Sequence, residues 1–335
     1  MQFEEMKSLG KKIPVLIDDK NYDEGMQQKV EPYLAKLCIK GYVSREKKLY
    51  YELYPQENSR GTIVLLHGFT ESLVKFHELI YYFHRAGYQV AALDHRGHGK
   101  SFREISDPNI VHISHFGDYI EDLHDFIHQA VLKKLTVDKA RFFIFGHSMG
   151  GCIAARYIEV YPDEFAAAIL NAPMTGINYA PFPAWSASII CYFFIAIGKG
   201  KERIFNQSNF SPKPDHAGAA SSSEARYMYY HRMRVADKHL QTSCADYYWG
   251  IEATKAGALI RRPEEESKIQ IPVLILMAEK DTLVDLDTQR AFASLLKEGR
   301  ALIAKKARHE IYGSPNEIVG PYLENLLDFL ETARS

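Results

Sequence analysis

The sequence has few cysteines, no excess of charge of one sign, no low-complexity segment and no hydrophobic run long enough to span a bilayer. Its four cysteines, Cys38, Cys152, Cys191 and Cys244, lie far apart and form neither a CxxC pair nor a Cys/His ligand pattern. So few thiols in a chain of 335 residues argue against a disulfide framework, and a reducing compartment is the better interpretation.

The near-neutral charge also excludes some partners. The chain has 41 basic and 42 acidic residues, which gives a formal charge of −1. This balance does not point to nucleic acid or another polyanion as the main partner. The segment from Met1 to Lys11 is polar and lacks the apolar core of a signal peptide, so we expect a cytoplasmic protein.

The most apolar stretch runs from Phe182 to Ile197 and carries no charge. It has only 16 residues and contains Pro183, whereas a membrane-spanning helix needs about 20 apolar residues. We interpret it as a buried or pocket-covering helix. The alternative is insertion into a lipid interface, which would make the protein peripheral to a membrane through a transient contact.

Short apolar runs rich in β-branched residues alternate with amphipathic, helix-like segments. This alternation predicts an α/β fold with a mostly parallel sheet covered on both faces. Residues 41–54 are expected to add two short edge strands. The expected strands are Thr62–Leu66, Val90–Leu93, Phe142–Phe145, Ala168–Leu170, Val273–Met277 and Leu302–Ala304, and the expected helices are Leu73–Ala86, Phe116–Val131, Met149–Tyr161 and Leu286–Leu296.

The alternation stops in the second half of the chain, where aromatic and helix-forming residues dominate. We therefore divide the chain into an N-terminal extension (1–40), a core (41–173 and 268–335) and an inserted helical cap (174–267). Near the C-terminus, the run from Ser314 to Glu317 has the form of a capping box with proline at the first helical position. Pro321 indicates that the last helix is either kinked there or begins there.

The strongest motif is Gly146-His147-Ser148-Met149-Gly150, which follows an apolar strand and precedes a helical run. A G-x-S-x-G elbow in this context presents the serine hydroxyl above the end of a sheet, as in α/β-hydrolases. The following helix N-terminus favours negative charge where an oxyanion forms. Ser148 is therefore the candidate nucleophile.

A serine nucleophile needs a base, and position must select it among 14 histidines. In this fold the order along the chain is serine, acid, histidine. His309 follows the last expected strand, and no other histidine lies beyond His239. Asp281 directly follows the preceding strand and is the expected acid. Asp285 is the alternative acid, although it could instead cap the next helix.

Two backbone N–H groups are expected to form the oxyanion hole. One belongs to Met149, which follows the nucleophile, and the other to Phe69 in the loop after the first core strand, where Gly68 lets the chain turn. His67 precedes this turn, and we expect it to be structural.

Several other groupings are not interpreted as sites. Residues 97–101 (GHGKS) resemble the end of a phosphate loop, but the required first glycine is Asp94. His124 and His128 share a helix face near Asp125 without a further ligand pattern, so we predict a solvated face and no metal. Six basic residues of the cap could attract a phosphate head group, with solvated surface charge as the default interpretation: Lys199, Lys201, Arg203, Arg226, Arg232 and Arg234.

The blocks HGFTES, DHRGHGKS and GHSMGG, together with NAPMTGI, closely resemble the bacterial lysophospholipase L2 and monoacylglycerol lipase branch of the α/β-hydrolases. The resemblance is strong over residues 41–178 and weaker over 271–330. It implies a cofactor-independent carboxylester hydrolase whose substrate is a single-chain lipid, that is, a small amphiphilic ester. It also places Ser148, Asp281 and His309 in the triad positions.

For such a substrate, we expect the apolar cap stretch to line or cover the acyl site, with Phe182, Trp185, Phe193 and Phe194 as the contact residues. A short-chain esterase and an aminopeptidase on the same scaffold stay open as alternatives. A peptidase would need a cap carboxylate, for which Glu202, Glu224 and Asp246 are candidates. A non-catalytic binding protein is the third interpretation. The sequence does not indicate an oligomeric state.

Overall fold

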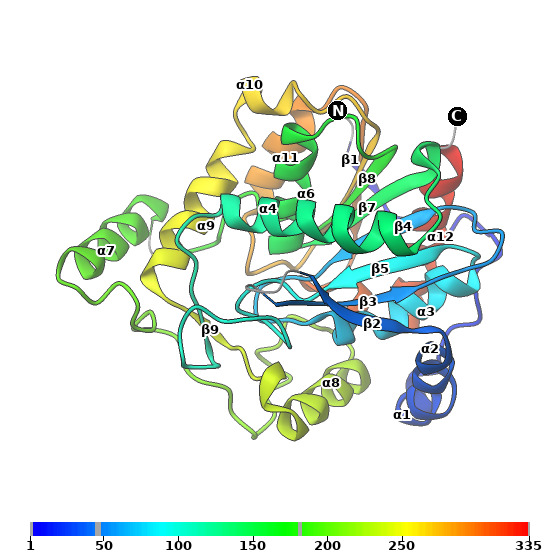
Figure 1. Cartoon of the computed structure of the whole chain (residues 1–335), viewed down its shortest axis with the longest axis horizontal. Coiled ribbons are helices and arrows are strands. Elements are labelled where there is room, and N and C mark those ends of the chain that lie inside the picture. The colour runs from blue at the N-terminus through cyan, green and yellow to red at the C-terminus, as the bar shows by residue number, and fades with distance from the viewer. Residues whose placement is uncertain (1–2, 44–47, 180–182, 334–335) are drawn as a thin grey trace.

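The computed structural model describes residues 3–43, 48–179 and 183–333. A nine-stranded sheet with the order β1-β11-β10-β8-β7-β4-β5-β3-β2 forms its centre (Figure 1). Neighbouring strands are parallel except that β3 runs antiparallel to both β5 and β2. The strands are β1 (Phe3–Glu5), β2 (Ile39–Val43), β3 (Leu49–Tyr54), β4 (Thr62–Leu66), β5 (Gln89–Leu93), β7 (Phe142–His147), β8 (Ala167–Asn171), β10 (Val273–Ala278) and β11 (Gly299–Ala304).

Two hydrophobic cores cover the two faces of this sheet. In β4, Ile63 and Leu65 pack into one core while Val64 and Leu66 pack into the other, as alternating side chains of a doubly covered strand must. One face carries α4 (Gly117–Phe126), α6 (Met149–Val160) and α11 (Leu286–Leu295), and the opposite face carries α3 (His77–Arg85) and α12 (Asn316–Thr332) (Figure 1).

The predicted core elements are confirmed, with shifts of a few residues at their ends. Each of the six expected core strands lies within an observed strand of the sheet, and the pair β2 and β3 accounts for the expected edge strands. The helix expected over 73–86 begins as the 3₁₀ turn η3 (Leu73–Phe76), and the one over 116–131 ends as the π-helical η4 (Ile127–Val131) followed by the short α5 (Leu132–Lys134). The 3₁₀ turn η5 (Lys139–Arg141) precedes β7.

The N-terminal segment packs on the core. Its strand β1 joins the sheet edge beside β11, and the turns and helices η1 (Asp19–Asn21), α1 (Tyr22–Gly25), η2 (Met26–Val30) and α2 (Glu31–Leu37) pack on the α3 face. Tyr22, Met26, Val30 and Leu34 recur every four residues and pack into the core on that face, so this segment carries a helical signal that the prediction from sequence did not use.

The start of α12 differs from the capping-box prediction. The residue before the helix is Pro315, which makes no side-chain cap, and Ser314 ends the preceding turn η7 (Ile311–Gly313). The Asn316 amide instead donates to the Asp19 carboxylate at 2.8 Å, so a distant residue caps this helix. The helix continues through Pro321, so it does not begin there.

The inserted segment between β8 and β10 forms the cap (Figure 1). It contains α7 (Ala184–Ala196), α8 (Glu224–Ala236), η6 (Lys238–Leu240), α9 (Tyr247–Leu259) and α10 (Pro263–Glu266). A two-residue strand, β9 (Cys244–Ala245), ties the cap to β6 (Ile110–Val111) of the core. In Figure 1, α7 projects away from the sheet. Among the described residues, none of the helices has the length and apolarity needed to cross a membrane.

Candidate active site

Ser148 occupies a tight turn between the end of β7 and the start of α6. Its backbone has φ of 52° and ψ of −116°, a conformation that non-glycine residues rarely adopt. A Cβ atom at Gly150 would lie 2.5 Å from the Leu66 carbonyl oxygen, and one at Gly146 would meet the Gly150 carbonyl. Gly150 is therefore needed for the close approach of the turn to β4, and Gly146 for the close approach of β7 to the first turn of α6.

His309 and Asp281 meet although 28 residues separate them. The loop after β11 carries His309, and the loop after β10 carries Asp281, so the adjacent carboxyl ends of these strands bring them together. His309 Nδ1 lies 2.7 Å from Asp281 Oδ2, and both side chains are buried. The second carboxylate oxygen, Oδ1, accepts the Leu283 and Val284 amides at 2.9 and 3.0 Å.

These contacts set the charge of Asp281. Burial opposes ionisation, but the hydrogen bond and charge of His309 and the two backbone amides lower the pKa of Asp281 below its usual value. The alternative acid, Asp285, is the N-cap of α11, where its carboxylate accepts the Asp287 and Thr288 amides. The structure therefore pairs His309 with Asp281.

Ser148 and His309 line one cavity of about 300 Å³ between the sheet and the cap. Because Asp281 occupies Nδ1 of His309, Nε2 is the ring nitrogen available to the serine. Core loops and cap together provide the apolar part of the wall, which consists of Phe69, Met174, Ile177, Tyr179, Ile204, Trp249, Leu283 and Val284.

Of the two expected oxyanion donors, Met149 directly follows Ser148 and Phe69 lines the same cavity as Ser148. Met149 is the first residue of α6, so its N–H has no acceptor within the helix. Phe69 lines the cavity in a turn whose Gly68 amide donates to Glu71 Oε2 at 2.6 Å. The Phe69 ring stacks on Trp249 of the cap, with centroids 4.0 Å apart, which fixes the turn from the other side.

The surroundings of His67 fit the structural role that the sequence predicts. Its side chain is fully buried, and Nε2 accepts the His95 amide at 3.0 Å.

A buried ionic network next to the triad was not anticipated from the sequence. Lys75 Nζ lies 2.8 Å from Glu71 Oε1 and 2.6 Å from Glu310 Oε1, and Tyr312 donates its hydroxyl to Glu71. The spacing of four residues between Glu71 and Lys75 could have suggested their ion pair, whereas for Glu310 the sequence signal was only that it follows His309.

The histidine that precedes the nucleophile stays neutral. The ring centroids of His147 and His309 are 4.8 Å apart. Burial, with the neighbouring charges of His309 and Lys75, lowers the pKa of His147 to about 3, although Glu71 acts in the opposite direction. An uncharged His147 therefore does not repel positive charge that develops on His309.

Three of the four residues expected to contact the acyl chain lie elsewhere, and the fourth is not described. Phe182 is outside the described residues. Trp185 and Phe193 are 67% and 58% exposed, and Phe194 stacks on Tyr247 with centroids 4.3 Å apart. None of these last three lines the cavity. Helix α7 projects away from the sheet (Figure 1). The apolar side chains that do line the cavity are the eight named above, from Phe69 to Val284.

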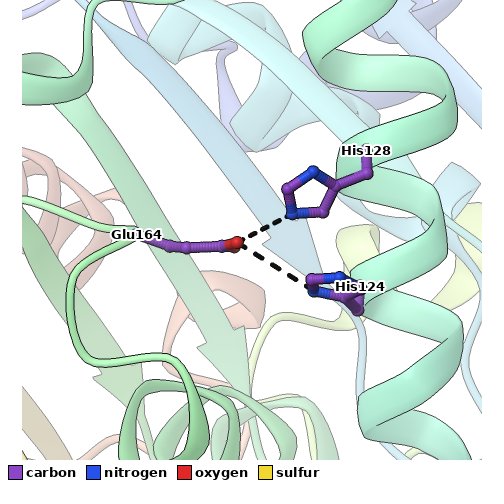
Figure 2. A group of neighbouring side chains, drawn as sticks. All are labelled: His124, His128 and Glu164. Carbon is purple, nitrogen blue, oxygen red and sulfur yellow. Dashed lines mark hydrogen bonds and ion pairs between the residues drawn. The ribbon is translucent and has the colours of Figure 1, made fainter.

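His124 and His128 have a partner that the sequence did not suggest. Glu164, which follows α6, points at both imidazoles (Figure 2). Its Oε1 lies 2.7 Å from His128 Nε2 and 4.0 Å from His124 Nδ1, while Tyr157 donates to Oε2. This is the one group of three potential metal-ligating residues found within the described parts of the chain. Each member already has a protein partner, and none lines the catalytic cavity.

Comparisons with known proteins agree with this geometry. Lysophospholipase L2 of Escherichia coli is 29% identical over 82% of this chain and 81% of its own length. A monoacylglycerol lipase of Mycolicibacterium smegmatis is 24% identical over 81% of this chain and 89% of its own. A structure of a monoglyceride lipase from Saccharomyces cerevisiae, bound to a substrate analogue, superposes with a TM-score of 0.68 at 18% identity and covers 89% of this chain and 95% of that one.

A family model described as serine aminopeptidase, S33, matches residues 57–316, which include the elbow, the cap, Asp281 and His309. The sheet order, the elbow between β7 and α6 and the paired loops after β10 and β11 are those expected of an α/β-hydrolase. The chain therefore belongs to the serine aminopeptidase S33 family of α/β-hydrolases.

Proposed function

We propose that the protein is a serine carboxylester hydrolase that cleaves the acyl ester of a single-chain lipid, either a lysophospholipid or a monoacylglycerol. The observation that carries this proposal is the cavity in which Ser148 and His309 meet an apolar wall of about eight side chains from the core and the cap. Such a wall favours a long acyl chain, since each buried CH₂ contributes about 0.8 kcal/mol. The curated relatives named as lipases support the same substrate class.

In the proposed mechanism, Ser148 Oγ attacks the acyl carbonyl carbon while His309 Nε2 accepts the hydroxyl proton. Asp281 Oδ2, which lies 2.7 Å from His309 Nδ1, accepts a hydrogen bond from the Nδ1 proton and stabilises the imidazolium that forms. His309 then donates its proton to the leaving alcohol, which departs and leaves an acyl-enzyme. Water, deprotonated by His309, attacks the acyl-enzyme ester, and His309 returns this proton to Ser148 Oγ as the bond to the acyl group breaks and the fatty acid leaves.

The Phe69 and Met149 amides are proposed to bind the carbonyl oxygen as it becomes negatively charged. Two preorganised N–H donors in a water-poor cavity stabilise this charge more than they stabilise the ground-state carbonyl. The stacking of Phe69 on Trp249 supports this assignment, because it links the position of one donor to the cap.

We also propose that α7 contacts the surface of the lipid aggregate that supplies the substrate. Trp185, Ile189, Tyr192, Phe193 and Ile197 are each at least half exposed, and α7 projects from the body of the molecule (Figure 1). An apolar surface of this kind, with aromatic residues, suits a membrane interface.

The aminopeptidase alternative is less well supported. A peptidase needs an unpaired carboxylate to bind the substrate ammonium. The cap candidates Glu202, Glu224 and Asp246 do not line the cavity, and Asp246 pairs with His112. Glu71 and Glu310 do line it, but Lys75 lies between them and already neutralises part of their charge.

The proposal is tested by product analysis with lysophosphatidylcholine and a monoacylglycerol of the same chain length. The wild type is expected to release fatty acid from at least one of them, and Ser148→Ala to lose about 10⁴-fold or more in kcat. Ser267→Ala, at an exposed cap position, is the matched control and should behave as wild type. Full activity of Ser148→Ala would refute the mechanism. Activity on p-nitrophenyl acetate but on neither lipid would refute only the lipid assignment.

A further inference from the structure

A second cavity, of about 220 Å³, adjoins the catalytic one. The two cavities share Thr70, Glu71, Ala220 and Glu310 as lining residues, and the second continues from the His309 loop toward helix α8. Its walls are more polar than those of the first, because charged and tyrosine side chains stand beside apolar ones such as Val74 and Met233. The catalytic residues therefore lie between an apolar space and a polar one.

The reaction determines which part of the substrate enters the polar space. His309 must donate its proton to the leaving alcohol, so the alcohol lies on the His309 side of the acyl carbonyl. Glu310 and Gly313, on the loop that carries His309, line the second cavity. The acyl chain then takes the apolar wall of Met174 and Ile177, and the head group enters the second cavity.

Among the described residues, one of the cations that line the second cavity has no carboxylate partner. Three carboxylates and three cations from the described residues line it. Lys75 lies between Glu71 and Glu310. Arg226 pairs with Glu78, at 2.7 Å, and with Asp19.

Arg234 has no carboxylate within ion-pair distance in the described parts of the chain. Its guanidinium donates to two backbone carbonyls, that of Leu240 at 3.0 Å and that of Thr242 at 2.8 Å, and lies 4.5 Å from the Phe210 ring centroid. These contacts hold the guanidinium in place without neutralising its charge. A guanidinium held in this way in a cavity wall is suited to bind a phosphate oxygen by charge-assisted hydrogen bonds.

We propose that the second cavity binds the glycerophosphodiester head group of a lysophospholipid and that Arg234 is the residue that recognises its phosphate. This inference rests on the proposed function and narrows it, since a monoacylglycerol has no phosphate to offer. Of the six basic cap residues considered from the sequence, only Arg226 and Arg234 line this cavity, and Arg226 already has carboxylate partners.

The test compares Arg234→Gln with Arg232→Gln in the full-length enzyme. Arg232 lies on the same helix, is exposed, pairs with Asp23 and does not line the cavity, so it controls for the loss of one positive charge. Each variant is assayed with lysophosphatidylcholine, with monoacylglycerol of the same acyl chain and with p-nitrophenyl butyrate. We expect Arg234→Gln to lower kcat/KM for lysophosphatidylcholine about 10- to 100-fold, while the other two substrates change less than about 2-fold. Arg232→Gln should change none of the three.

A second measurement needs no variant. Glycerophosphocholine should inhibit hydrolysis of p-nitrophenyl butyrate by the wild type competitively, whereas glycerol at the same concentration should not. Inhibition by inorganic phosphate as strong as that by glycerophosphocholine would indicate a general anion site and would overturn the head-group assignment; weaker inhibition supports it. Equal inhibition by glycerol, or none by glycerophosphocholine, would overturn the inference.

Failure of the inference and failure of the proposed function give different results. Equal loss on all three substrates in Arg234→Gln, or no loss on any, would reject the phosphate role while lipid hydrolysis by the wild type stands. Release of fatty acid from neither lipid by the wild type, with p-nitrophenyl butyrate still cleaved, would reject the lipid function itself.

Discussion

Replacing Asp281 by asparagine tests the proposed triad of Ser148, His309 and Asp281 at the contact between Asp281 and His309. In the structure, Oδ1 of Asp281 accepts two backbone amides, so the oxygen of an asparagine would be held at that position. Its NH₂ group would then point at His309 Nδ1, which Asp281 Oδ2 contacts at 2.7 Å. A donor at this place forces Nδ1 to accept, and the imidazole proton moves to Nε2.

The consequence for catalysis is large because the imidazole would hold the wrong tautomer. With a proton on Nε2, His309 cannot accept the proton of Ser148, and the imidazolium also loses the negative charge that stabilises it. The same substitution in a serine protease triad lowers kcat about 10⁴-fold, and we expect about 10³- to 10⁴-fold here, which corresponds to about 4–5.5 kcal/mol of activation free energy.

The assay measures kcat for a p-nitrophenyl ester together with the thermal midpoint. Asp285→Asn is the matched control, because Asp285 only caps α11 and asparagine caps helices equally well. We expect its activity to stay within about 2-fold of wild type. The reasoning is refuted if Asp281→Asn keeps more than about a tenth of wild-type activity while folded, or if Asp285→Asn is the inactive variant.

Two further predictions concern stability and membrane contact. Although burial acts in the opposite direction, hydrogen bonds to Glu31 and Glu52 raise the pKa of His77 to about 9. This stabilisation is complete below about pH 6.5 and is lost as the pH rises through 9. Wild type should therefore lose up to about 3 kcal/mol of unfolding free energy over that range, and His77→Asn much less; equal slopes in denaturant titrations would contradict this. Replacing Trp185 and Phe193 of α7 together by serine should weaken binding to phosphatidylcholine vesicles about 10-fold or more and leave hydrolysis of a soluble short-chain ester unchanged. Unaltered vesicle sedimentation would remove α7 as the contact.

The sequence by itself determined the sheet, the elbow and the partners expected for the serine. Period-2 and period-3.6 patterns depend on neighbours along the chain, so they identified β4, β7, α6 and the other core elements within a few residues. The elbow depends on five consecutive residues, and the chain order of acid and histidine follows from the order of the parallel strands. These features are local or topological, and a single sequence carries them.

The tertiary structure alone decided how distant side chains meet. Asp19 caps α12 from nearly 300 residues away, Lys75 pairs with Glu310, and Glu164 lies against His124 and His128. Such pairs leave no periodic signal, because each depends on the packing of two elements whose contact is not encoded locally.

Tertiary structure also decided which cap residues line the active site. The apolar cap helix α7 was expected over the active site, but it projects outward, and the cavity wall comes from residues such as Trp249 and Ile204. Composition showed that the segment is apolar, and only its docking on the core decided which side chains face the nucleophile. The sequence likewise placed Arg232 and Arg234 in one basic group. Packing of α8 leaves Arg232 exposed, whereas Arg234 lines the cavity next to the catalytic one.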